Sequence, residues 1–511
     1  MSDTILKLLS RGAGAHTAIG APETPDLGFD GLRQHVRKTI GTLRCLGIGR
    51  NDRVAIVLPN GPDMASAFVS VAAAATTAPL NPAYRDEEFE FYLSDLNAKA
   101  LIVDADGDSP ATAVAERLGV GVLRLTTRST EAAGLFDLRG EAVDEPSGDA
   151  DAAAEDIALV LHTSGTTSRP KIVPLSHANT CASAKNISAT LSLDPEDRCL
   201  NVMPLFHIHG LMAAVLASLS AGASVHCPPG FNALGFFSWL DEVRPTWYTA
   251  VPTMHQAILA RAERNREIIG RSRLRLIRSS SASLPPQVMA ELEEVFGVPV
   301  IESYGMTEAA HQMASNPLPP KPRKPGSVGL PAGPEIAILG EAGALQPQGA
   351  QGEVAIRGDN VTTGYETNPE ANAGAFTDGW FRTGDLGFFD EDGYLTITGR
   401  LKEIINRGGE KISPREVDEV LTGHDAVAQA VTFAVPHGKL GEDVAAAVVL
   451  REGRSLTEKE LRDFAAERLA AFKVPRTVVF LDEIPKGATG KLQRIGLAEQ
   501  LALTKTIVAV Q

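Results

Sequence analysis

The sequence predicts an α/β fold, in which a large N-terminal domain of stacked, mainly parallel sheets with helices and a β-rich subdomain precedes a small α+β C-terminal domain. The chain has 511 residues, more than the ~150 of a typical domain. Strand-like apolar runs alternate with helical runs as far as about residue 302, which is typical of parallel sheets covered by helices. The pattern changes after Gly326 and again at Arg400, so we expect domains over residues 1–399 and 400–511.

The first elements follow from the spacing of apolar side chains. Leu32, Val36 and Ile40 recur at four-residue steps, which predicts an amphipathic helix. A strand at residues 54–58 and a helix of small residues near 65–75 come next. The same alternation then predicts strands at 100–103, 157–161, 200–203, 224–227, 247–250, 274–278 and 298–302, with helices at 178–191 and from about residues 211, 252 and 285.

Two segments are expected to connect these units. Residues 147–155 are polar and low in complexity, and residues 316–326 are rich in proline, which fixes φ and removes backbone donors. Beyond them the pattern is β-rich, with glycine turns near 352–358 and 393–399. The last part of the chain predicts helices at 414–421 and 457–469 and strands at 431–435, 444–450 and 478–481.

The composition favours a globular protein and excludes some partners. With 44% hydrophobic and 22% charged residues the chain can bury a core, and its formal charge of −15 argues against a broad surface for nucleic acid or anionic membrane. We find no signal peptide, no membrane-spanning run and no peroxisomal tripeptide, so we expect a cytoplasmic protein. The four cysteines lack CxxC spacing and are expected to be buried, reduced thiols: Cys45, Cys181, Cys199 and Cys227.

A hydroxyl-rich loop is the strongest chemical signal. Thr163-Ser-Gly-Thr-Thr-Ser-Arg-Pro-Lys171 follows the apolar strand at 157–161, and hydroxyls, backbone N–H groups and a lysine are what a polyphosphate needs. No Gly-Lys-Ser/Thr follows Gly165 at the P-loop spacing, so this loop is of another kind. Its candidate phosphate-binding residues are Thr163, Ser164, Gly165, Thr166, Thr167 and Lys171.

Further strings occur in an order known from one superfamily. They are Met203–Gly210, Tyr304–Glu308, Gly352–Glu353, Gly364–Tyr365, Trp380–Asp385, Gly399–Glu403, Gly408–Pro414 and Pro485–Lys491. With them the chain resembles the acyl-adenylate-forming enzymes, which include AMP-forming acyl-CoA synthetases, adenylation domains and luciferases. The resemblance implies that a carboxylate attacks the α-phosphate of ATP to give acyl-AMP, from which coenzyme A then displaces AMP. It therefore implies ATP, Mg²⁺ and coenzyme A as cofactors and co-substrates.

The resemblance also assigns roles around the nucleotide. It places the Tyr304 ring against adenine, the Thr307 hydroxyl on the α-phosphate and the Glu308 carboxylate on Mg²⁺. A carboxylate together with phosphate oxygens is a typical environment for this cation. Asp385 would hold the ribose hydroxyls, and Arg400 would reach the same ribose.

The C-terminal part contributes further residues by the same resemblance. Lys491 would enter the site on a mobile domain and bridge the attacking carboxylate and the α-phosphate, where fixed cations must offset the charge of the transition state. Lys402 resembles the hinge about which that domain rotates, and Gly408 and Gly409 would line the tunnel for coenzyme A. In the N-terminal part, His207 is counted among the catalytic residues.

The acid is predicted from a narrower resemblance. Within the superfamily the chain most resembles the oxalate–CoA ligases, in the segments 162–171, 205–210, 246–253, 277–284, 308–311 and 406–414. By this resemblance His209, Ser281 and His311 lie in the acid pocket, and such polar groups suit a second carboxylate because an alkyl tail would leave them unpaired. Arg278 is expected to stabilise the end of its strand.

Oxalate is therefore the expected substrate, and the alternative is malonate or another short-chain acid. From other classes, a stand-alone adenylation protein that loads an acyl carrier protein stays open, although no carrier signature occurs before Gln511. A non-catalytic nucleotide-binding protein is disfavoured by the intact Glu308, Asp385 and Lys491. The sequence leaves open whether the protein is a monomer or a homodimer.

Overall fold

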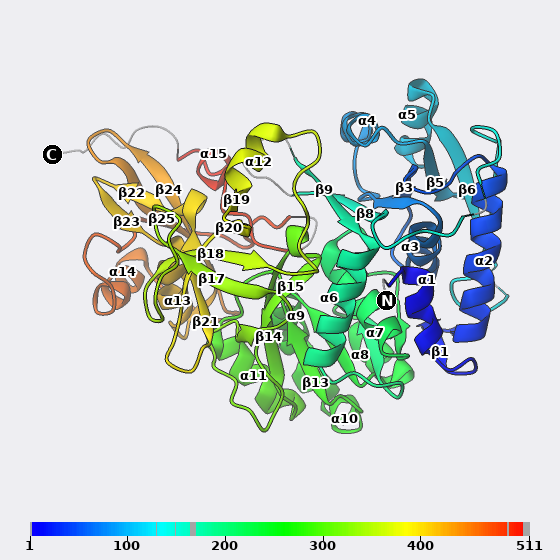
Figure 1. The fold of residues 1–511 in the computed structure, drawn as a ribbon. Helices are drawn as coiled ribbons and strands as arrows, with labels where there is room; N and C mark the ends of the chain where they lie inside the picture. The colour runs from blue at the N-terminus through cyan, green and yellow to red at the C-terminus, as the bar shows by residue number, and fades with distance from the viewer. Residues whose placement is uncertain (1–2, 129, 149, 164–169, 488–489, 504–511) are drawn as a thin grey trace.

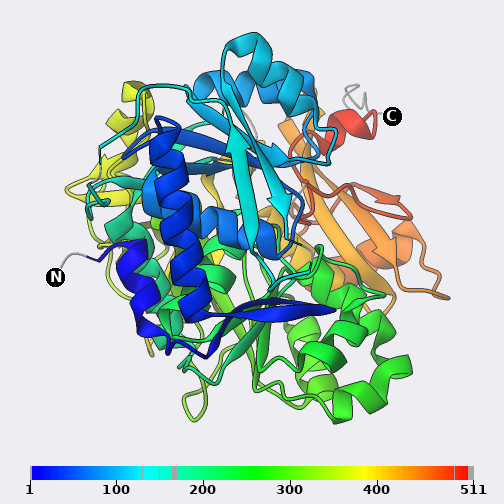
Figure 2. The same ribbon diagram turned by 90° about the vertical axis from the view of Figure 1, so that its right-hand side faces the viewer.

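The computed structural model describes residues 3–128, 130–148, 150–163, 170–487 and 490–503. Four sheets make up the fold, and the two largest of them are mainly parallel, with helices between successive strands (Figure 1). The C-terminal elements form the fourth sheet at one end of the molecule, as the orange and red ribbon shows in both views (Figure 2). The predicted α/β class, with a large N-terminal part and a smaller C-terminal part, is confirmed.

The seven-stranded sheet has the order β7-β6-β5-β3-β4-β8-β9. Its pairing is parallel except at the two edges, where β7 and β9 run antiparallel to their neighbours. The strands are β3 (Arg53–Val57), β4 (Thr76–Pro79), β5 (Ala100–Asp104), β6 (Gly121–Thr127), β7 (Phe136–Gly140), β8 (Ile157–His162) and β9 (Ile172–Ser176). The helices that accompany it are α2 (Phe29–Cys45), α3 (Pro62–Ala74), α4 (Asp86–Asp95), α5 (Pro110–Leu118) and α6 (His177–Thr190).

The nine-stranded sheet has the order β16-β15-β14-β13-β12-β10-β11-β1-β2. Its central strands are parallel, and these strands present their carboxyl ends at one edge, where ligand sites of such sheets lie. The strands are β1 (Thr17–Ala21), β2 (Thr24–Gly28), β10 (Arg198–Asn201), β11 (Ser224–His226), β12 (Trp247–Ala250), β13 (Leu276–Ser279), β14 (Val300–Met306), β15 (His311–Ser315) and β16 (Leu330–Pro331). The helices are α1 (Ile5–Leu8), η1 (Leu9–Arg11), η2 (His209–Leu216), α7 (Ala217–Ser220), α8 (Phe236–Val243), α9 (Pro252–Ala262), η3 (Glu263–Asn265), α10 (Arg266–Gly270), α11 (Pro286–Phe296) and η4 (Thr307–Ala309).

The two smaller sheets follow in sequence. The third is antiparallel and consists of β17 (Glu335–Leu339), β18 (Gly352–Arg357), β19 (Phe376–Thr377), β20 (Trp380–Phe389) and β21 (Leu395–Arg400), with α12 (Pro369–Ala375) beside it. The chain then passes through η5 (Leu401–Glu403) into the fourth sheet. That sheet consists of β22 (Ile405–Arg407), β23 (Glu410–Ile412), β24 (Val427–His437), β25 (Gly441–Leu450) and β26 (Thr477–Phe480), with helices α13 (Pro414–Thr422), α14 (Glu458–Ala466) and α15 (Leu497–Gln500).

The main core lies between the two large sheets and is filled by helices that are apolar all round. Every residue of α3 from Met64 to Ala74 is buried, and so is every residue of η2. A helix with no polar face must be enclosed on all sides. The same core cluster contains Ile56 of β3 and Trp247 of β12, so it joins the two sheets into one packed unit.

Two expectations are corrected by the structure. Cys181, Cys199 and Cys227 are buried free thiols as predicted, but Cys45 is exposed because it ends α2 on the solvent side. The helix expected from residue 211 begins at His209 and is a π-helix. Among the described helices, none is both long and apolar enough to cross a membrane.

Candidate active site

The candidate site lies where the carboxyl ends of β10, β12, β13 and β14 meet the third sheet. Tyr304 lies in the last part of β14, and the segments that follow β10, β13 and β14 carry three further predicted site residues: His209, Ser281 and Glu308. The third sheet adds Asp385 and Arg400, which face each other in the antiparallel pairing of β20 with β21. The topology therefore gathers residues as far apart in the sequence as His209 and Arg400, and the parallel strands place their share of them at one edge of the sheet.

The proposed ribose and adenine residues form one hydrogen-bonded group. Asp385 is buried and accepts hydrogen bonds from the hydroxyl of Tyr304 at 2.5 Å and from Nε of Arg400 at 2.7 Å. Burial and the nearby Asp385 charge raise the pKa of Tyr304, so the phenol keeps its proton. The Arg400 side chain is 58% exposed, which leaves its guanidinium room to turn toward a ligand.

Glu308 lies in η4 beside a tyrosine and a lysine. Its carboxylate is buried and accepts a hydrogen bond from the Tyr365 hydroxyl at 2.8 Å. Lys171 Nζ lies 4.3 Å from the centre of the same Tyr365 ring. Burial raises the pKa of Glu308, and the hydrogen bond from Tyr365 and the charges of Arg400 and Lys171 oppose that rise. Thr307, the residue before Glu308, is half-buried.

The residues around Glu308 fit a magnesium ion that is shared with phosphate. Among the described residues there is no cluster of three or more His, Cys, Asp or Glu that could hold a metal by itself. Mg²⁺ is commonly bound by one or two carboxylates and completes its shell with phosphate oxygens and water. One buried carboxylate next to Lys171 matches that donor set.

Two hydrogen bonds join Thr163 and Lys171, the two ends of the hydroxyl-rich loop. The backbone N–H of Lys171 donates to Oγ1 of Thr163 at 3.1 Å, and the N–H of Thr163 donates to the carbonyl of Lys171 at 2.9 Å. Burial and the charge of Lys402 lower the pKa of Lys171. The predicted Ser164, Gly165, Thr166 and Thr167 lie outside the described residues.

The three predicted acid-pocket residues lie together. His209 is fully buried, with Nδ1 at 3.0 Å from Oγ of Ser281 and Nε2 at 2.6 Å from Oγ1 of Thr249. Its ring meets the His311 ring edge to face, with the centroids 4.9 Å apart. Ser281 and His311 both have positive φ, at 73° and 98°, a conformation that costs energy for residues with a Cβ.

Lys491 reaches this group from the C-terminal part of the chain. Oγ1 of Thr253, at the start of α9, donates to the carbonyl of Gly490 at 2.7 Å and holds the lysine loop in place. Burial and the charge of Arg400 lower the pKa of Lys491 to about 8, and Asp385 opposes the change. Burial and the Lys491 charge lower the pKa of His207 to about 3.

The remaining predicted residues lie on the surface of the C-terminal part. Lys402 is exposed in η5. Gly408 and Gly409 form the turn between β22 and β23 with φ of 61° and 100°, which glycine adopts readily. Their hydrogen bonds go to Leu440 and Asn406, so in this arrangement the structure does not bring them to the acid pocket.

Three residues of the site were missed or misread from sequence. Thr249 is hydrogen-bonded to His209, and Tyr365 donates to Glu308, yet neither residue was assigned a role from the sequence. Arg278 was expected only to stabilise a strand end, but it lies fully buried beside His209. A polar residue near the carboxyl end of a buried strand was the available signal for both Thr249 and Arg278.

Known proteins show the same organisation. The model of the AMP-binding enzyme family matches residues 11–366, and that of the AMP-binding enzyme C-terminal domain matches residues 416–491. An oxalate–CoA ligase of Arabidopsis thaliana is 49% identical over 461 residues, 88% of each chain, and one of Saccharomyces cerevisiae is 42% identical over 478 residues, 89% of this chain and 87% of that one. The crystal structure of ATP-bound MatB from Rhodopseudomonas palustris superposes with a TM-score of 0.88 at 28% identity, over 98% of this chain and 99% of that one.

Proposed function

Since the chain belongs to the AMP-binding enzyme family and is an AMP-forming acid–CoA ligase that uses ATP and coenzyme A, we propose that the acid it activates is oxalate. The observation that carries the proposal is the polar group made by His209, Ser281 and His311. Two curated relatives are named for oxalate, which supports the same choice.

The chemistry of the pocket favours a short second carboxylate over an alkyl chain. Nδ1 of His311 is buried and has no hydrogen-bond partner within the described part of the chain. A buried polar atom left unpaired costs about 1–3 kcal/mol, and an alkyl substituent would leave it so. A carboxylate oxygen of oxalate can pair with such a group, and the Ser281 hydroxyl offers a second donor.

The nucleotide roles follow from the arrangement around Asp385. Tyr304 provides a face for adenine, Asp385 accepts hydrogen bonds from the ribose hydroxyls, and Arg400 reaches the same ribose. Thr307 binds phosphate oxygens, and so do Lys171 and Thr163, which lie at the two ends of the hydroxyl-rich loop. Glu308 would hold Mg²⁺, which would screen the negative charge of the phosphates.

Lys491 acts in the first step. A carboxylate oxygen of oxalate forms a bond to the α-phosphorus, the bond from that phosphorus to the bridging oxygen breaks, and pyrophosphate leaves. The buried ammonium group of Lys491 would lie between the two anions and offset the charge that builds up as they approach. His207 is half-buried next to Lys491 and stays neutral, so it orients groups by hydrogen bonding.

The second step uses coenzyme A. Its thiolate attacks the acyl carbon, the bond between that carbon and the phosphate oxygen breaks, and AMP leaves with the electron pair. We assign residues 400–511 to a domain that rotates about Lys402 between the steps, against a domain of residues 1–399. The rotation would bring the turn of Gly408 and Gly409, now at the surface, to the coenzyme A path.

The test is coenzyme A-dependent AMP formation with a panel of oxalate, malonate, acetate, succinate, a long-chain acid and an aromatic acid. Oxalate is expected to give the highest kcat/KM, by about tenfold or more, because a second carboxylate of a short diacid can pair with both Nδ1 of His311 and the hydroxyl of Ser281. A monocarboxylate that outperforms oxalate would overturn the proposal. Pyrophosphate exchange without any coenzyme A turnover would instead support a protein that loads an acyl carrier.

A further inference from the structure

Arg278 is a fully buried cation directly behind the acid pocket. It lies on β13, where it is paired in register with Thr249 on β12, and its side chain has no exposed surface. Nη1 lies 3.4 Å from both Oγ1 of Thr249 and Nε2 of His209, and Nη2 lies 3.4 Å from Oε1 of Gln312. These are long contacts to neutral acceptors, and Nε has no partner in the described residues.

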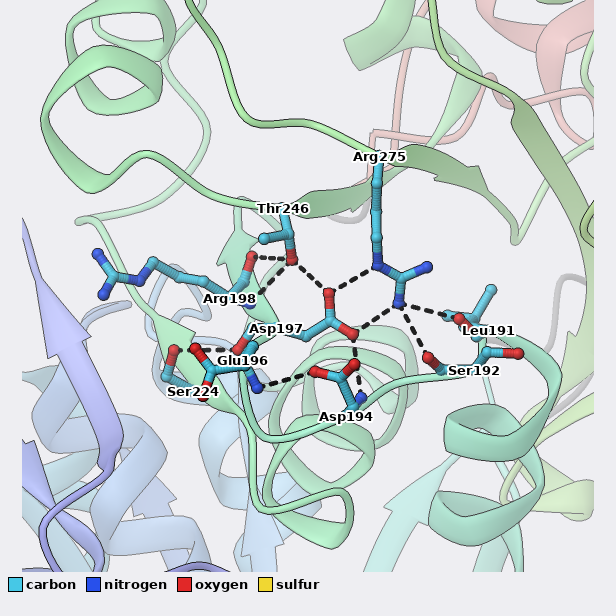
Figure 3. Close-up of polar contacts among 9 residues, drawn as sticks. All are labelled: Leu191, Ser192, Asp194, Glu196, Asp197, Arg198, Ser224, Thr246 and Arg275. Carbon is cyan, nitrogen blue, oxygen red and sulfur yellow. Dashed lines mark hydrogen bonds and ion pairs between the residues drawn. The ribbon is translucent and has the colours of Figure 1, made fainter.

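No carboxylate pairs with this guanidinium within the part of the chain that the structure describes. Arg275, three positions earlier, shows the contrast: it makes two hydrogen bonds to Asp197, at 2.7 and 2.6 Å, and others to the carbonyls of Leu191 and Ser192 (Figure 3). Other arginines with restricted exposure also hold acids: Arg382 with Glu353, Arg407 with Asp443 and Arg494 with Asp418.

An unpaired buried charge is costly, and its cost falls when an anion enters the same space. Burial lowers the pKa of Arg278 to about 9, so the guanidinium still carries its charge at neutral pH. Since the protein supplies no acid to Arg278 among the described residues, an anionic ligand could supply the missing negative charge. The nearest predicted ligand position is the acid pocket on the far side of His209.

The contacts of Arg278 also determine which groups donate and which accept in the hydrogen bonds around His209. An arginine only donates, so its N–H toward Nε2 of His209 favours the imidazole with the proton on Nδ1. Thr249 can then accept from Arg278 and donate to Nε2, while Nδ1–H donates to Oγ of Ser281. Ser281 therefore accepts from His209 and can donate its own hydroxyl proton to the substrate. The series of hydrogen bonds that begins at Arg278 thus ends in a donor.

We propose that Arg278 is the positioning residue that makes the acid pocket select a substrate with a second anionic group: acting through Thr249, His209 and Ser281, it turns donors toward that group and offsets its charge. The inference rests on the proposed function, because it assumes that the acid binds beside His209. It goes further by naming the residue on which discrimination between a dianion and a monoanion depends.

The experiment compares oxalate with oxamate, an isosteric monoanion in which an amide replaces one carboxylate. Arg278→Met is expected to lower kcat/KM for oxalate by about tenfold to a hundredfold, mainly through KM, while values for oxamate and ATP change little. Arg278→Lys keeps a charge and is expected to keep most of the discrimination. Arg275→Met is the matched control, and it should leave the oxalate-to-oxamate ratio unchanged whatever it does to stability.

Equal losses for oxalate and oxamate in Arg278→Met would overturn the inference, and so would an Arg278→Lys enzyme that discriminates no better than Arg278→Met. If Arg278→Met does not fold, Thr249→Val tests the same chain of hydrogen bonds, and an unchanged ratio there is equally contradictory. If the wild-type enzyme does not use oxalate, the proposed function fails by itself. If another diacid is used, the ratio is then measured for that diacid against its monoamide, with the same two outcomes, and an enzyme that uses only monocarboxylic acids would overturn the inference as well.

Discussion

At the scale of single residues, burial separates the charged groups of the site from the neutral ones. Burial and nearby cations lower the pKa of His209 and His311 well below the usual range, so both imidazoles are uncharged at pH 7. Lys491 and Arg278 keep their protons there. A site made of two buried cations and neutral donors is suited to bringing two anions, a carboxylate and a triphosphate, into contact.

The lowered pKa of Lys491 predicts a pH dependence of the first step. The lysine acts as a cation, so kcat/KM for ATP in the free enzyme should fall as the pH rises through about 8, the pKa of that group. The measurement is pyrophosphate exchange against pH. In Lys491→Arg the falling limb should move beyond about pH 10, because an arginine stays protonated. A limb at the same pH in wild type and Lys491→Arg would assign it to another group.

The residues of the site could be predicted only where a pattern set them apart. His209, Ser281 and His311 were expected in one pocket, and the structure brings them together. Arg278 could not be distinguished from Arg275 in the sequence, because both lie within the strand that was expected at residues 274–278. The difference is that Arg275 has Asp197 within reach, and that pairing arises only when β10 and β13 approach in space.

At the scale of elements, apolar periodicity predicted most central strands and helices but not their ends. The strand expected at 298–302 is β14, which continues to Met306 because it pairs antiparallel with β15. That partner strand was not expected, since its sequence, His311–Ser315, shows little apolar alternation. Strand pairing between segments with such polar sequences depends on tertiary packing, which a local pattern does not contain.

Glu302 of β14 predicts a pH dependence of stability. One carboxylate oxygen accepts from the N–H of Leu284 at 2.9 Å, and the other has no partner among described residues. Burial raises the pKa of Glu302 to about 7. The folded state therefore holds a proton that the unfolded chain has released, so stability is lost as the pH rises from the usual glutamate range through 7.

Glu302→Gln should remove this dependence, since glutamine resembles the protonated acid and can still accept from Leu284. Urea unfolding should show wild type less stable than the variant at pH 8, by on the order of 2 kcal/mol, and nearly equal to it at about pH 5. Glu294→Gln, at an exposed position of the same helix α11, is the control for loss of one negative charge. The assignment would be contradicted if the wild-type protein gained stability relative to Glu302→Gln as the pH rises from about 5 to about 8.

At the scale of the whole molecule, the acidic chain concentrates a few cations at one place. The formal charge is −15, yet Lys171 and Lys402 lie close enough for the charge of Lys402 to lower the pKa of Lys171, and Arg400 does the same to Lys491. Lys171 lies between β8 and β9, Arg400 ends β21, and Lys402 lies in η5. Lys491 follows β26, the last strand of the fourth sheet, and Figure 1 shows these elements. Net charge predicted the absence of a broad polyanion surface and carried no information about this local site.

The measurement that tests the central claim most directly is a single turnover with labelled oxalate, ATP and Mg²⁺, first without and then with coenzyme A. Wild-type protein should form oxalyl-AMP and convert it to oxalyl-CoA when coenzyme A is added. Lys491→Ala should lose the first step by about a hundredfold or more, because its cation is absent from the transition state, but should still convert supplied oxalyl-AMP. No oxalyl-AMP in the wild-type reaction, or equal loss of both steps in Lys491→Ala, would contradict it.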